Sequence, residues 1–386
     1  MLSFHSTVLK EESITVSSMN HLKIRLFKNQ LKNRHYNLDR YFIAGIKFRI
    51  LDLSTIEKYD LQKMYKIYDE WPQIARKSFE SSQESVNFEN IDHIVFAGMG
   101  GSGTIGDVFS AILSKTKIHV NVVKGYLLPT TVDSNTLVIT MSISGNTAEA
   151  LAVLDSAYKR KSKIIAFSSG GKMLEYCTKN KIEHRLVPQY HSPRASFTSY
   201  LYTMFKVLHS TLEIKQQDVL ESIIELEKIC KKINSSNLTT NNPSLNLAEW
   251  ITDIPMIYYP FGLQSVATRF KNVLQENAKI HAIAEDVVEA CHNGIVSWER
   301  KSNIKPILIQ GKDDHIKTKE KWKIIKEYFY QNKIDYREII SIEGSILSKI
   351  INLVYILDYC SIYKAILTET DPTPVKSIDF IKSRSS

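Results

Sequence analysis

Cysteine is scarce in this chain of 386 residues, and its distribution narrows the possible kinds of site. The four cysteines are Cys177, Cys230, Cys291 and Cys360, which lie far apart and form no CxxC pair. This spacing gives no support to a zinc cluster. It favours reduced, buried thiols in a cytoplasmic protein over a disulfide framework.

Long apolar runs are also missing. No stretch of about 18 apolar residues is free of charge or strong polarity, so we expect no membrane span. The N-terminus lacks a compact apolar segment followed by a small-residue cleavage site, which argues against secretion. Hydrophobic residues still make up 43% of the chain, enough for large cores, and the length suggests two domains.

Acidic residues are outnumbered, with 41 Asp and Glu against 50 Lys and Arg, giving a net charge of +9. The basic residues are spread along the chain without a single-sign stripe, so a solvated basic surface explains them better than a nucleic-acid partner. Residues 1–55 are basic, with interleaved aromatics and no sustained period. A nucleic-acid arm fits this segment, but a poorly ordered extension or a start codon placed too far upstream fits it better.

A glycine-rich turn is the most informative motif. Residues 93–107 read HIVFAGMGGSGTIGD, and an apolar helical pattern follows from about residue 104 to 113. This order predicts a strand, a tight loop and a helix N-terminus. The first N–H groups of a helix lack internal partners and lie at the positive end of its dipole, which suits an anion such as phosphate. A purely structural tight turn is the alternative.

A second polar loop repeats this architecture. Residues 136–141 predict a strand, which leads into SISGNT at 142–147 and a helix over 148–161. Ligands of parallel sheets bind beyond the carboxyl ends of the strands, where two loops face each other. Two such loops in one domain favour phosphate, or a phosphorylated small molecule, over two structural turns.

The alternation of strands and helices predicts an α/β fold with mostly parallel, doubly wound sheets covered by helices on both faces. Further strands are expected at 118–123, 163–168, 182–187, 255–260, 305–310 and 336–342, and further helices at 55–79, 172–179, 217–233, 266–279, 316–332 and 345–367. The Ser-, Asn- and Thr-rich run 234–243 is the best domain boundary. We therefore expect an extension at 1–55, a first domain at 56–240 with the phosphate loops, and a second domain at 241–386.

The resemblance to a known family emerges when these loops are combined with four further features. They are Arg194 after a proline, QENAK at 275–279, the His292-Asn293 pair, and Lys382 near the C-terminus. Together they resemble the archaeal-type bifunctional phosphoglucose/phosphomannose isomerases, whose two halves are sugar-isomerase (SIS) domains. The resemblance covers about residues 56–386.

This resemblance implies that the substrate is fructose 6-phosphate, exchanged with glucose 6-phosphate and mannose 6-phosphate. The phosphate would be bound by Gly100, Gly101, Ser102, Ser142, Ser144 and Thr147. Glu276 would move a proton between C1 and C2, and Arg194 would stabilise the enediolate. His292 and Lys382 would assist ring opening. The resemblance further implies a homodimer in which the histidine reaches the neighbouring subunit's site, and no metal or organic cofactor.

The chemistry requires the same residue types. Proton abstraction next to a carbonyl needs a carboxylate within hydrogen-bond reach. The developing oxyanion needs a fixed cation, and an arginine cannot lose its proton. Ring opening suits a histidine, which titrates near neutrality. Considered alone, Glu276 is an ordinary helix residue and His292 an ordinary turn residue. Only the wider pattern makes them candidates for the active site.

The sequence departs from the family pattern at two points. Residues 289–294 read EACHNG where the family usually has ELNHNE. The family's threonine that makes room for both C2 epimers has no clear match, and Thr373 is the nearest candidate.

Two alternative functions compete with that of an isomerase. A sugar-phosphate-sensing regulator would need a helix-turn-helix module, which residues 1–55 do not display. An enzyme that transfers or releases the amino group of glucosamine 6-phosphate is the other alternative. The glutamine-dependent kind would need an N-terminal nucleophilic cysteine, whereas the first cysteine is Cys177; a deaminase needs no such cysteine and stays open.

Overall fold

The computed structural model describes residues 42–43, 46–47 and 51–384 and divides the chain into two compact units, Met1–Thr55 and Ile56–Ser386. In the first unit, β1 (Phe42–Ile43) pairs with β2 (Ile46–Lys47) in antiparallel fashion. The nucleic-acid arm and the poorly ordered extension considered for residues 1–55 fall mostly outside the described residues.

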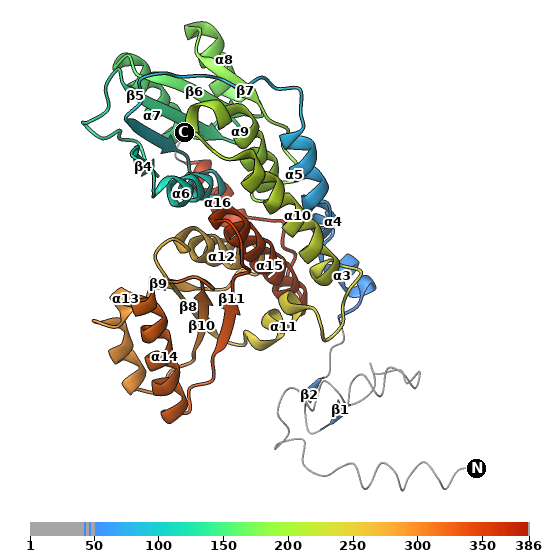
Figure 1. The fold of residues 1–386 in the computed structure, drawn as a ribbon. Helices are drawn as coiled ribbons and strands as arrows, with labels where there is room; N and C mark the ends of the chain where they lie inside the picture. Colours follow the sequence, from blue (N-terminus) through green and yellow to red (C-terminus); the bar gives the residue numbers. More distant parts are fainter. Residues whose placement is uncertain (1–41, 44–45, 48–50, 385–386) are drawn as a thin grey trace, which may run out of the picture. The chain divides into compact units, whose positions relative to one another are not determined.

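The second unit contains two parallel sheets, and the first of these follows the glycine-rich motif (Figure 1). Its strands are β3 (His93–Ala97), β4 (His119–Val123), β5 (Thr136–Ser142), β6 (Lys163–Ser168) and β7 (Glu183–Leu186). They lie in the order β4-β3-β5-β6-β7, and every pairing is parallel. The chain steps to one side after β3 and to the other after β5, so the strand order reverses between these two strands. Ligands of open parallel sheets bind at such a reversal.

Helices cover both faces of this sheet. They are α6 (Gly101–Leu113), α7 (Ala148–Lys159), α8 (Gly171–Asn180) and α9 (Phe197–Leu212). On one face, α7 and α8 bury apolar side chains such as Val153 and Met173 against Val138 of β5. On the other face, Phe96 of β3 stacks on Phe109 of α6, which contacts Phe205 of α9. Alternate side chains of each strand therefore pack into two separate cores, one on each face of the sheet.

The second sheet repeats the strand order with four strands. They are β8 (Ile254–Tyr259), β9 (Ile283–Asp286), β10 (Ile304–Gln310) and β11 (Arg337–Ile340), in the order β11-β10-β8-β9. One face is covered by α13 (Val287–Ala290), the 3-10 helix η3 (Gly294–Glu299) and α14 (Ile316–Gln331), around Trp298, Trp322 and Phe329. The predicted α/β fold with parallel, helix-flanked sheets is confirmed, although β9 was not expected because its four residues carry two acids.

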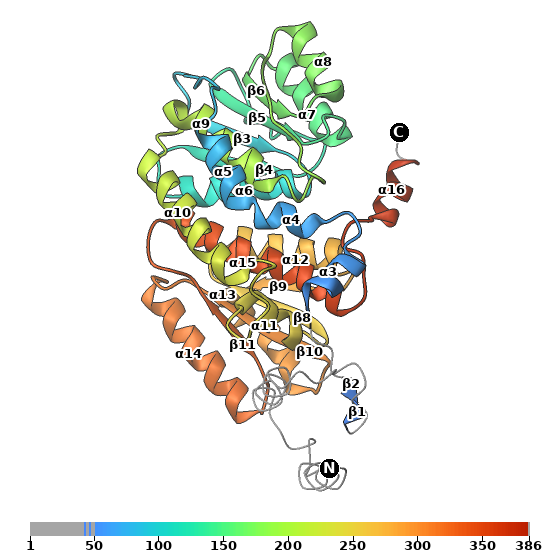
Figure 2. The same cartoon turned by 90° about the vertical axis from the view of Figure 1, so that its right-hand side faces the viewer.

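A layer of helices lies between the two sheets of this unit (Figure 2). It contains α10 (Gln216–Ile233), α12 (Gln264–Asn277) and α15 (Ile346–Leu367), and α11 (Pro243–Trp250) packs against α15. By length and composition alone α15 could cross a membrane, but 89% of its apolar window is buried inside the protein. It is therefore a core helix, and α10, α11 and α12 pack against it.

The single helix predicted over residues 55–79 is wrong. The structure has three helices there, α3 (Leu53–Tyr59), α4 (Met64–Asp69) and α5 (Trp71–Phe79). The buried Asp60 carboxylate accepts hydrogen bonds from the N–H groups of Met64 and Tyr65, and Lys63 adopts a left-handed conformation with φ of 57°. A carboxylate that caps a new helix start ends the preceding helix, which the apolar spacing alone did not reveal.

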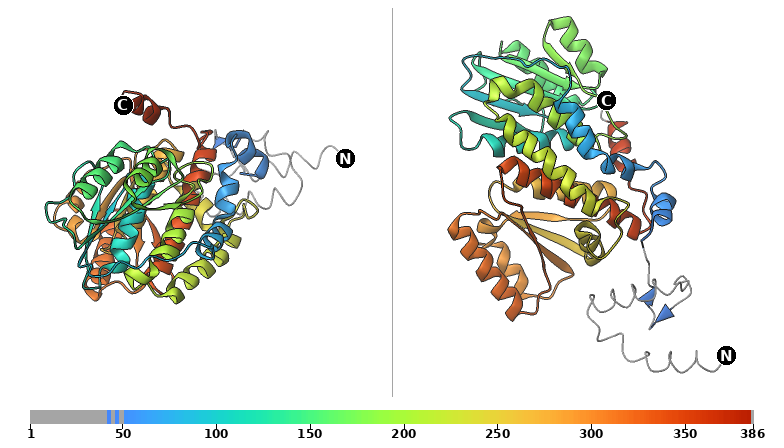
Figure 3. Two further views of the ribbon diagram at one scale, coloured as in Figure 1. Left: turned by 90° about the horizontal axis from the view of Figure 1, so that it is seen from above. Right: turned by 45° about the vertical axis from the view of Figure 1, so that its right-hand side comes forward.

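The expected C-terminal tail contains a helix, α16 (Lys376–Lys382), in which no residue is buried. Figures 2 and 3 show this helix standing apart from the two sheets of its unit. The helix after the glycine-rich strand also differs from the prediction, since α6 begins at Gly101 rather than near residue 104. Part of the glycine motif therefore forms the first turn of the helix.

Candidate active site

The glycine-rich loop ends β3 and opens α6, and some of its backbone N–H groups lack a partner among the described residues. Gly100, in a left-handed conformation with φ of 54°, is the residue before the helix, and Ser102 is buried in its first turn. The N–H groups of Ser102 and Gly103 donate to the Met99 carbonyl. Those of Gly100 and Gly101 donate no hydrogen bond within the described part of the chain. This is the arrangement that binds anions at helix N-termini.

The serine-rich loop ends β5 and opens α7. The buried Ser142 hydroxyl lies 2.8 Å from the Thr147 hydroxyl and accepts the Thr147 N–H at 3.3 Å. Ser144 is exposed, and its hydroxyl accepts the N–H of Asn146 at 3.3 Å. The three hydroxyl residues therefore lie in the loop that precedes the second helix.

The two loops lie side by side at the reversal of strand order. A Cβ built on Gly98 would lie 3.1 Å from the Met141 carbonyl oxygen and 2.8 Å from the Ser102 side chain. Glycine is therefore required where β3 ends, because any side chain would separate the loops. Both predicted phosphate-binding loops consequently open on the same edge of the sheet.

Arg194 lies next to the glycine-rich loop and is almost completely buried, with 4% of its surface exposed. A Cβ on Gly101 would lie 4.0 Å from the Arg194 Cα, so the two backbones are in close contact. The guanidinium donates through Nη2 to the carbonyls of Pro372 and Thr373, at 2.7 and 2.8 Å. Its charge is therefore fixed in place by hydrogen bonds to main-chain oxygens.

Glu276 and Asn277, the last two residues of α12, supply the remaining partners of this guanidinium. The Nε group donates to Asn277 Oδ1 at 2.6 Å, and Nη1 lies 3.5 Å from Glu276 Oε2. The Glu276 side chain keeps 27% of its surface exposed, whereas Asn277 is buried and donates to Ser361 of α15 at 2.8 Å. The structure therefore brings together Arg194 and Glu276, which are 82 positions apart in the sequence.

Lys279 joins the same cluster from the turn after α12. Its amine donates to the carbonyls of Glu276, Asn277 and Pro372. Desolvation and, to a smaller extent, the nearby charge of Arg194 lower the pKa of Lys279 to about 8, while Asp371 and Glu276 oppose the shift. The segment around Pro372 is thus held by both cations.

Thr373, the candidate for the epimer-tolerating threonine, lies at this cluster as well. Its carbonyl accepts the Arg194 hydrogen bond, and its hydroxyl oxygen is buried without a hydrogen-bond partner among the described residues. A buried hydroxyl without a partner costs about 1–3 kcal/mol, which a bound polar ligand could recover.

His292 and Lys382 belong to other elements of the chain. His292 follows α13 and is exposed, and Lys382 ends α16 and is also exposed. Within the described part of the chain, no hydrogen bond or ion pair connects either side chain with Arg194 or Glu276. Within the described residues, contacts therefore connect Arg194 with Glu276 and with the glycine-rich loop, but with neither of these two.

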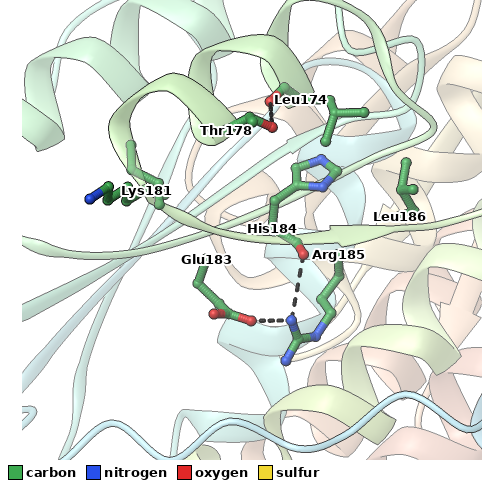
Figure 4. Close-up of a pocket in the computed structure, with 8 residues that line it drawn as sticks. Leu174, Thr178, Lys181, Glu183, His184, Arg185 and Leu186 are labelled. Carbon is green, nitrogen blue, oxygen red and sulfur yellow. Dashed lines mark hydrogen bonds and ion pairs between the residues drawn. The ribbon is translucent and has the colours of Figure 1, made fainter.

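A separate pocket of about 410 Å³ lies at the outer edge of the first sheet, between β7 and α8 (Figure 4). Its lining includes Glu183, His184 and Arg185, but none of the predicted site residues. Arg185 pairs with Glu183, and His184 is hydrogen-bonded to Ser168 at 2.8 Å. Glu183, His184 and Arg185 therefore already have polar partners, and none of the proposed chemistry is placed in this pocket.

Several residues at the site escaped the sequence analysis. Asn277 and Lys279 lie in the quoted QENAK motif without an assigned role, while Arg269 and Asp358 were not noticed at all. Asp358 is a carboxylate in the middle of the apolar helix α15, a signal that could have marked it as paired. Across the residues that the structure describes, no group of three or more His, Cys, Asp or Glu side chains could hold a metal ion.

The fold defines a class of protein with two SIS domains. The SIS domain family matches residues 87–212, and the family described as the bacterial phospho-glucose isomerase C-terminal SIS domain matches residues 240–384. The fold resembles the C-terminal domain of glucosamine-fructose-6-phosphate aminotransferase from Francisella tularensis, with a TM-score of 0.63 at 17% identity over 81% of this chain and 98% of that one.

Relatives narrow this class to one family. A bifunctional phosphoglucose/phosphomannose isomerase from Caldicellulosiruptor bescii is 32% identical over 81% of this chain and 96% of its own. A D-glucosamine-6-phosphate 4-epimerase from Sulfolobus acidocaldarius is 29% identical over 64% of this chain and 77% of its own. The chain belongs to the bifunctional phosphoglucose/phosphomannose isomerase family, and it is an isomerase.

Proposed function

We propose that this isomerase interconverts glucose 6-phosphate and mannose 6-phosphate with fructose 6-phosphate, by moving a proton between C1 and C2. The observation that carries the proposal is the contact between a buried cation and a half-buried carboxylate beside the phosphate loops. Arg194 Nη1 lies 3.5 Å from Glu276 Oε2, and Arg194 abuts Gly101. A base and an oxyanion-stabilising cation are the two groups that an enediolate mechanism needs.

The substrate phosphate would bind at the two loops that open on one edge of the first sheet. Unpaired N–H groups of the glycine-rich loop and the hydroxyls of Ser142, Ser144 and Thr147 would donate to its oxygens. Anchoring the phosphate would leave the sugar carbons free to reach toward α12. Binding energy from this remote group would help to orient the reacting carbons.

Glu276 would take the proton from C2 of the opened aldose and return it to C1. The guanidinium of Arg194 would stabilise the negative charge that develops on the neighbouring oxygen, since its position is fixed by main-chain carbonyls before substrate arrives. The buried, unpaired hydroxyl of Thr373 would face the sugar near C2 and would hydrogen-bond either epimer. Tolerance at this position would account for action on both hexoses.

Ring opening would need His292 and Lys382, and we propose that a second copy of the chain completes the site with His292. His292 is exposed, and Val288 and Val296, four positions before and after it in the sequence, are exposed at 40% and 57% of their surface. Burial of these side chains against a second copy would favour such an assembly. Lys382 would act once α16, which has no buried residue in the single chain, packs against a site.

The test is a coupled assay that follows fructose 6-phosphate formation from glucose 6-phosphate and, separately, from mannose 6-phosphate. We expect turnover of both substrates. Activity with glucose 6-phosphate alone would leave the isomerase chemistry standing and refute the dual specificity. Activity with neither would refute the proposed function.

A second candidate is action on a hexosamine 6-phosphate. The relative named D-glucosamine-6-phosphate 4-epimerase favours it, because it matches 64% of this chain. Incubation with glucosamine 6-phosphate, followed by sugar analysis and an ammonia assay, tests it. A new epimer or released ammonia, without hexose 6-phosphate turnover, would replace the first proposal with this one.

A further inference from the structure

Arg269 forms a buried ion pair directly behind the site. It belongs to α12, two turns before Glu276, and only 2% of its surface is exposed. Its Nη2 group lies 2.6 Å from Oδ2 of Asp358 on α15, which is fully buried, and its Nε donates to the same oxygen at 3.1 Å. Taking two charges out of water is costly, so stability alone is a poor explanation for such a pair.

The same guanidinium also reaches the first domain at three points. Nη2 donates to the main-chain oxygen of Arg194 at 2.7 Å. The Phe197 ring, at the start of α9, lies 4.4 Å from the guanidinium carbon. A Cβ on Gly101 would lie 3.3 Å from Nη1, so this nitrogen packs against the start of α6.

One helix therefore holds Arg194 at both its main chain and its side chain. Positions 269 and 276 are seven residues apart and share a face of α12. Arg269 bonds the Arg194 carbonyl, while Glu276 and Asn277 contact its guanidinium. Any shift of the Arg269 side chain would move the main chain of Arg194 relative to Glu276.

We propose that Arg269 is a positioning residue for the isomerisation step. Held by Asp358 and by the Phe197 ring, it fixes the main chain of Arg194 and the start of the glycine-rich loop relative to α12. It does not touch substrate. It sets the distance between the proposed base and the cation that stabilises the enediolate, and in this respect the inference rests on the proposed function.

The Arg269→Lys substitution tests this role. Lysine keeps the positive charge beside Asp358, but it lacks the planar fork that bonds a carboxylate and a main-chain carbonyl at once. Displacement of a catalytic group by about 1 Å costs up to about 100-fold in rate, so we expect kcat to fall by about 10-fold or more. Because the phosphate loops keep their own hydrogen bonds, KM should change by less than about 3-fold.

The matched control is Tyr363→Phe, on the same helix as Asp358. The buried Tyr363 hydroxyl donates to the carbonyls of Ile233 and Asn234, so its loss removes buried hydrogen bonds away from Arg194. We expect this variant to melt at a lower temperature with unchanged kcat. A kcat that falls equally in both variants, in proportion to the loss of stability, would overturn the positioning role.

A second variant covers the case in which Arg269→Lys does not fold. Phe197→Leu removes the ring from the face of the guanidinium but keeps its hydrogen bonds, and we expect kcat to fall by about 3-fold with KM unchanged. A folded Arg269→Lys or Phe197→Leu protein with wild-type kcat would overturn the inference while leaving the proposed function intact.

Failure of the proposed function itself would show in the wild-type chain as absent hexose 6-phosphate turnover. The positioning role would then be tested by calorimetry, which measures the binding of a five-carbon aldonate 5-phosphate to wild type and to Arg269→Lys. The carboxylate of this compound imitates the planar enediolate. Weaker binding to Arg269→Lys than to wild type, with equal binding of inorganic phosphate, would support the positioning role. Equal binding of the aldonate to both proteins, or to neither, would overturn it.

Discussion

Arg194 is the residue at which the proposed chemistry is most tightly constrained. Its guanidinium has one carboxylate neighbour, and three neutral oxygens accept its other hydrogen bonds. Neutral acceptors orient a cation without cancelling its charge. Arg194 can therefore keep its positive charge available for a developing oxyanion while its position is fixed.

Glu276→Gln tests the proposed base. Glutamine has the same shape but cannot accept the proton, so we expect kcat to fall by about 100- to 10,000-fold while substrate still binds. Steady-state assays and calorimetric titration with fructose 6-phosphate measure the two effects. The matched control is Glu175→Gln, the same change at an exposed position of α8, which should have no effect. Near-normal turnover by Glu276→Gln would show that the base is another group.

Lys279 should react with amine reagents at an unusually low pH. Desolvation and the charge of Arg194 lower the pKa of Lys279 to about 8, from its ordinary 10.5. Acetylation followed by mass spectrometry across pH should give a midpoint near this value, with exposed Lys117 as the reference for reagent activity. In Glu276→Gln the midpoint should fall, because the Glu276 carboxylate raises the pKa of Lys279. A midpoint at 10.5 would contradict the assignment.

The lowered pKa of Lys279 also makes the free energy of unfolding depend on pH. The folded chain holds the Lys279 proton less tightly than the unfolded chain does. The Lys279 contribution to the free energy of unfolding is therefore constant below about pH 8 and rises between there and 10.5. Comparison of wild type with Lys279→Met in denaturant titrations at several pH values isolates this contribution.

At the scale of single elements, the loops after β5 and β6 depend on each other. Gly145 has φ of 72°, and a Cβ there would collide with the carbonyl oxygen of Gly170. Gly171 in turn faces the Ser144 carbonyl and the Asn146 side chain. The serine-rich loop is thus shaped by the loop beside it as well as by its own sequence.

Gly145→Ala should therefore distort the proposed phosphate site. We expect the free energy of unfolding to fall by at least about 2 kcal/mol, from backbone strain and steric conflict, and KM for hexose 6-phosphates to rise. Thermal unfolding and steady-state assays measure these changes. Gly125→Ala is the control, since a Cβ there meets nothing within 4 Å and should be neutral. Equal behaviour of the two variants would show that the loop tolerates a side chain at 145.

At the scale of the whole molecule, the site is incomplete in one chain if His292 takes part. His292 is exposed after α13, and among the described residues it forms no hydrogen bond or ion pair with Arg194 or Glu276. In a symmetric dimer, a group on one subunit's surface can complete the site of the other. The proposal therefore concerns assembly as much as chemistry.

Mixing two inactive variants tests this arrangement. Glu276→Gln and His292→Ala, refolded together, should regain about a quarter of wild-type activity, since half of the dimers are mixed and each has one intact site. Each variant refolded alone is the control. No recovery, with mixed dimers demonstrated by native mass spectrometry, would show that His292 acts within its own chain.

The sequence by itself determined the local features of this protein. Apolar alternation and helical periodicity predicted most strands and helices, because these signals reside in consecutive residues. Glycines between a strand and a helix indicated the first of the two loops at the proposed phosphate site, and hydroxyl residues indicated the second. The quoted motifs were sufficient to identify the family resemblance that the comparisons confirm.

Only the tertiary structure decided which distant residues meet. The break at Asp60, the strand β9 and the pairing of Arg269 with Asp358 depend on burial and on partners far away in the sequence. The same is true of Arg194, whose neighbours come from α12 and from the segment near Pro372. Local patterns encode which side chains are available, but packing fixes the direction and distance of each charge, and the chemistry depends on those.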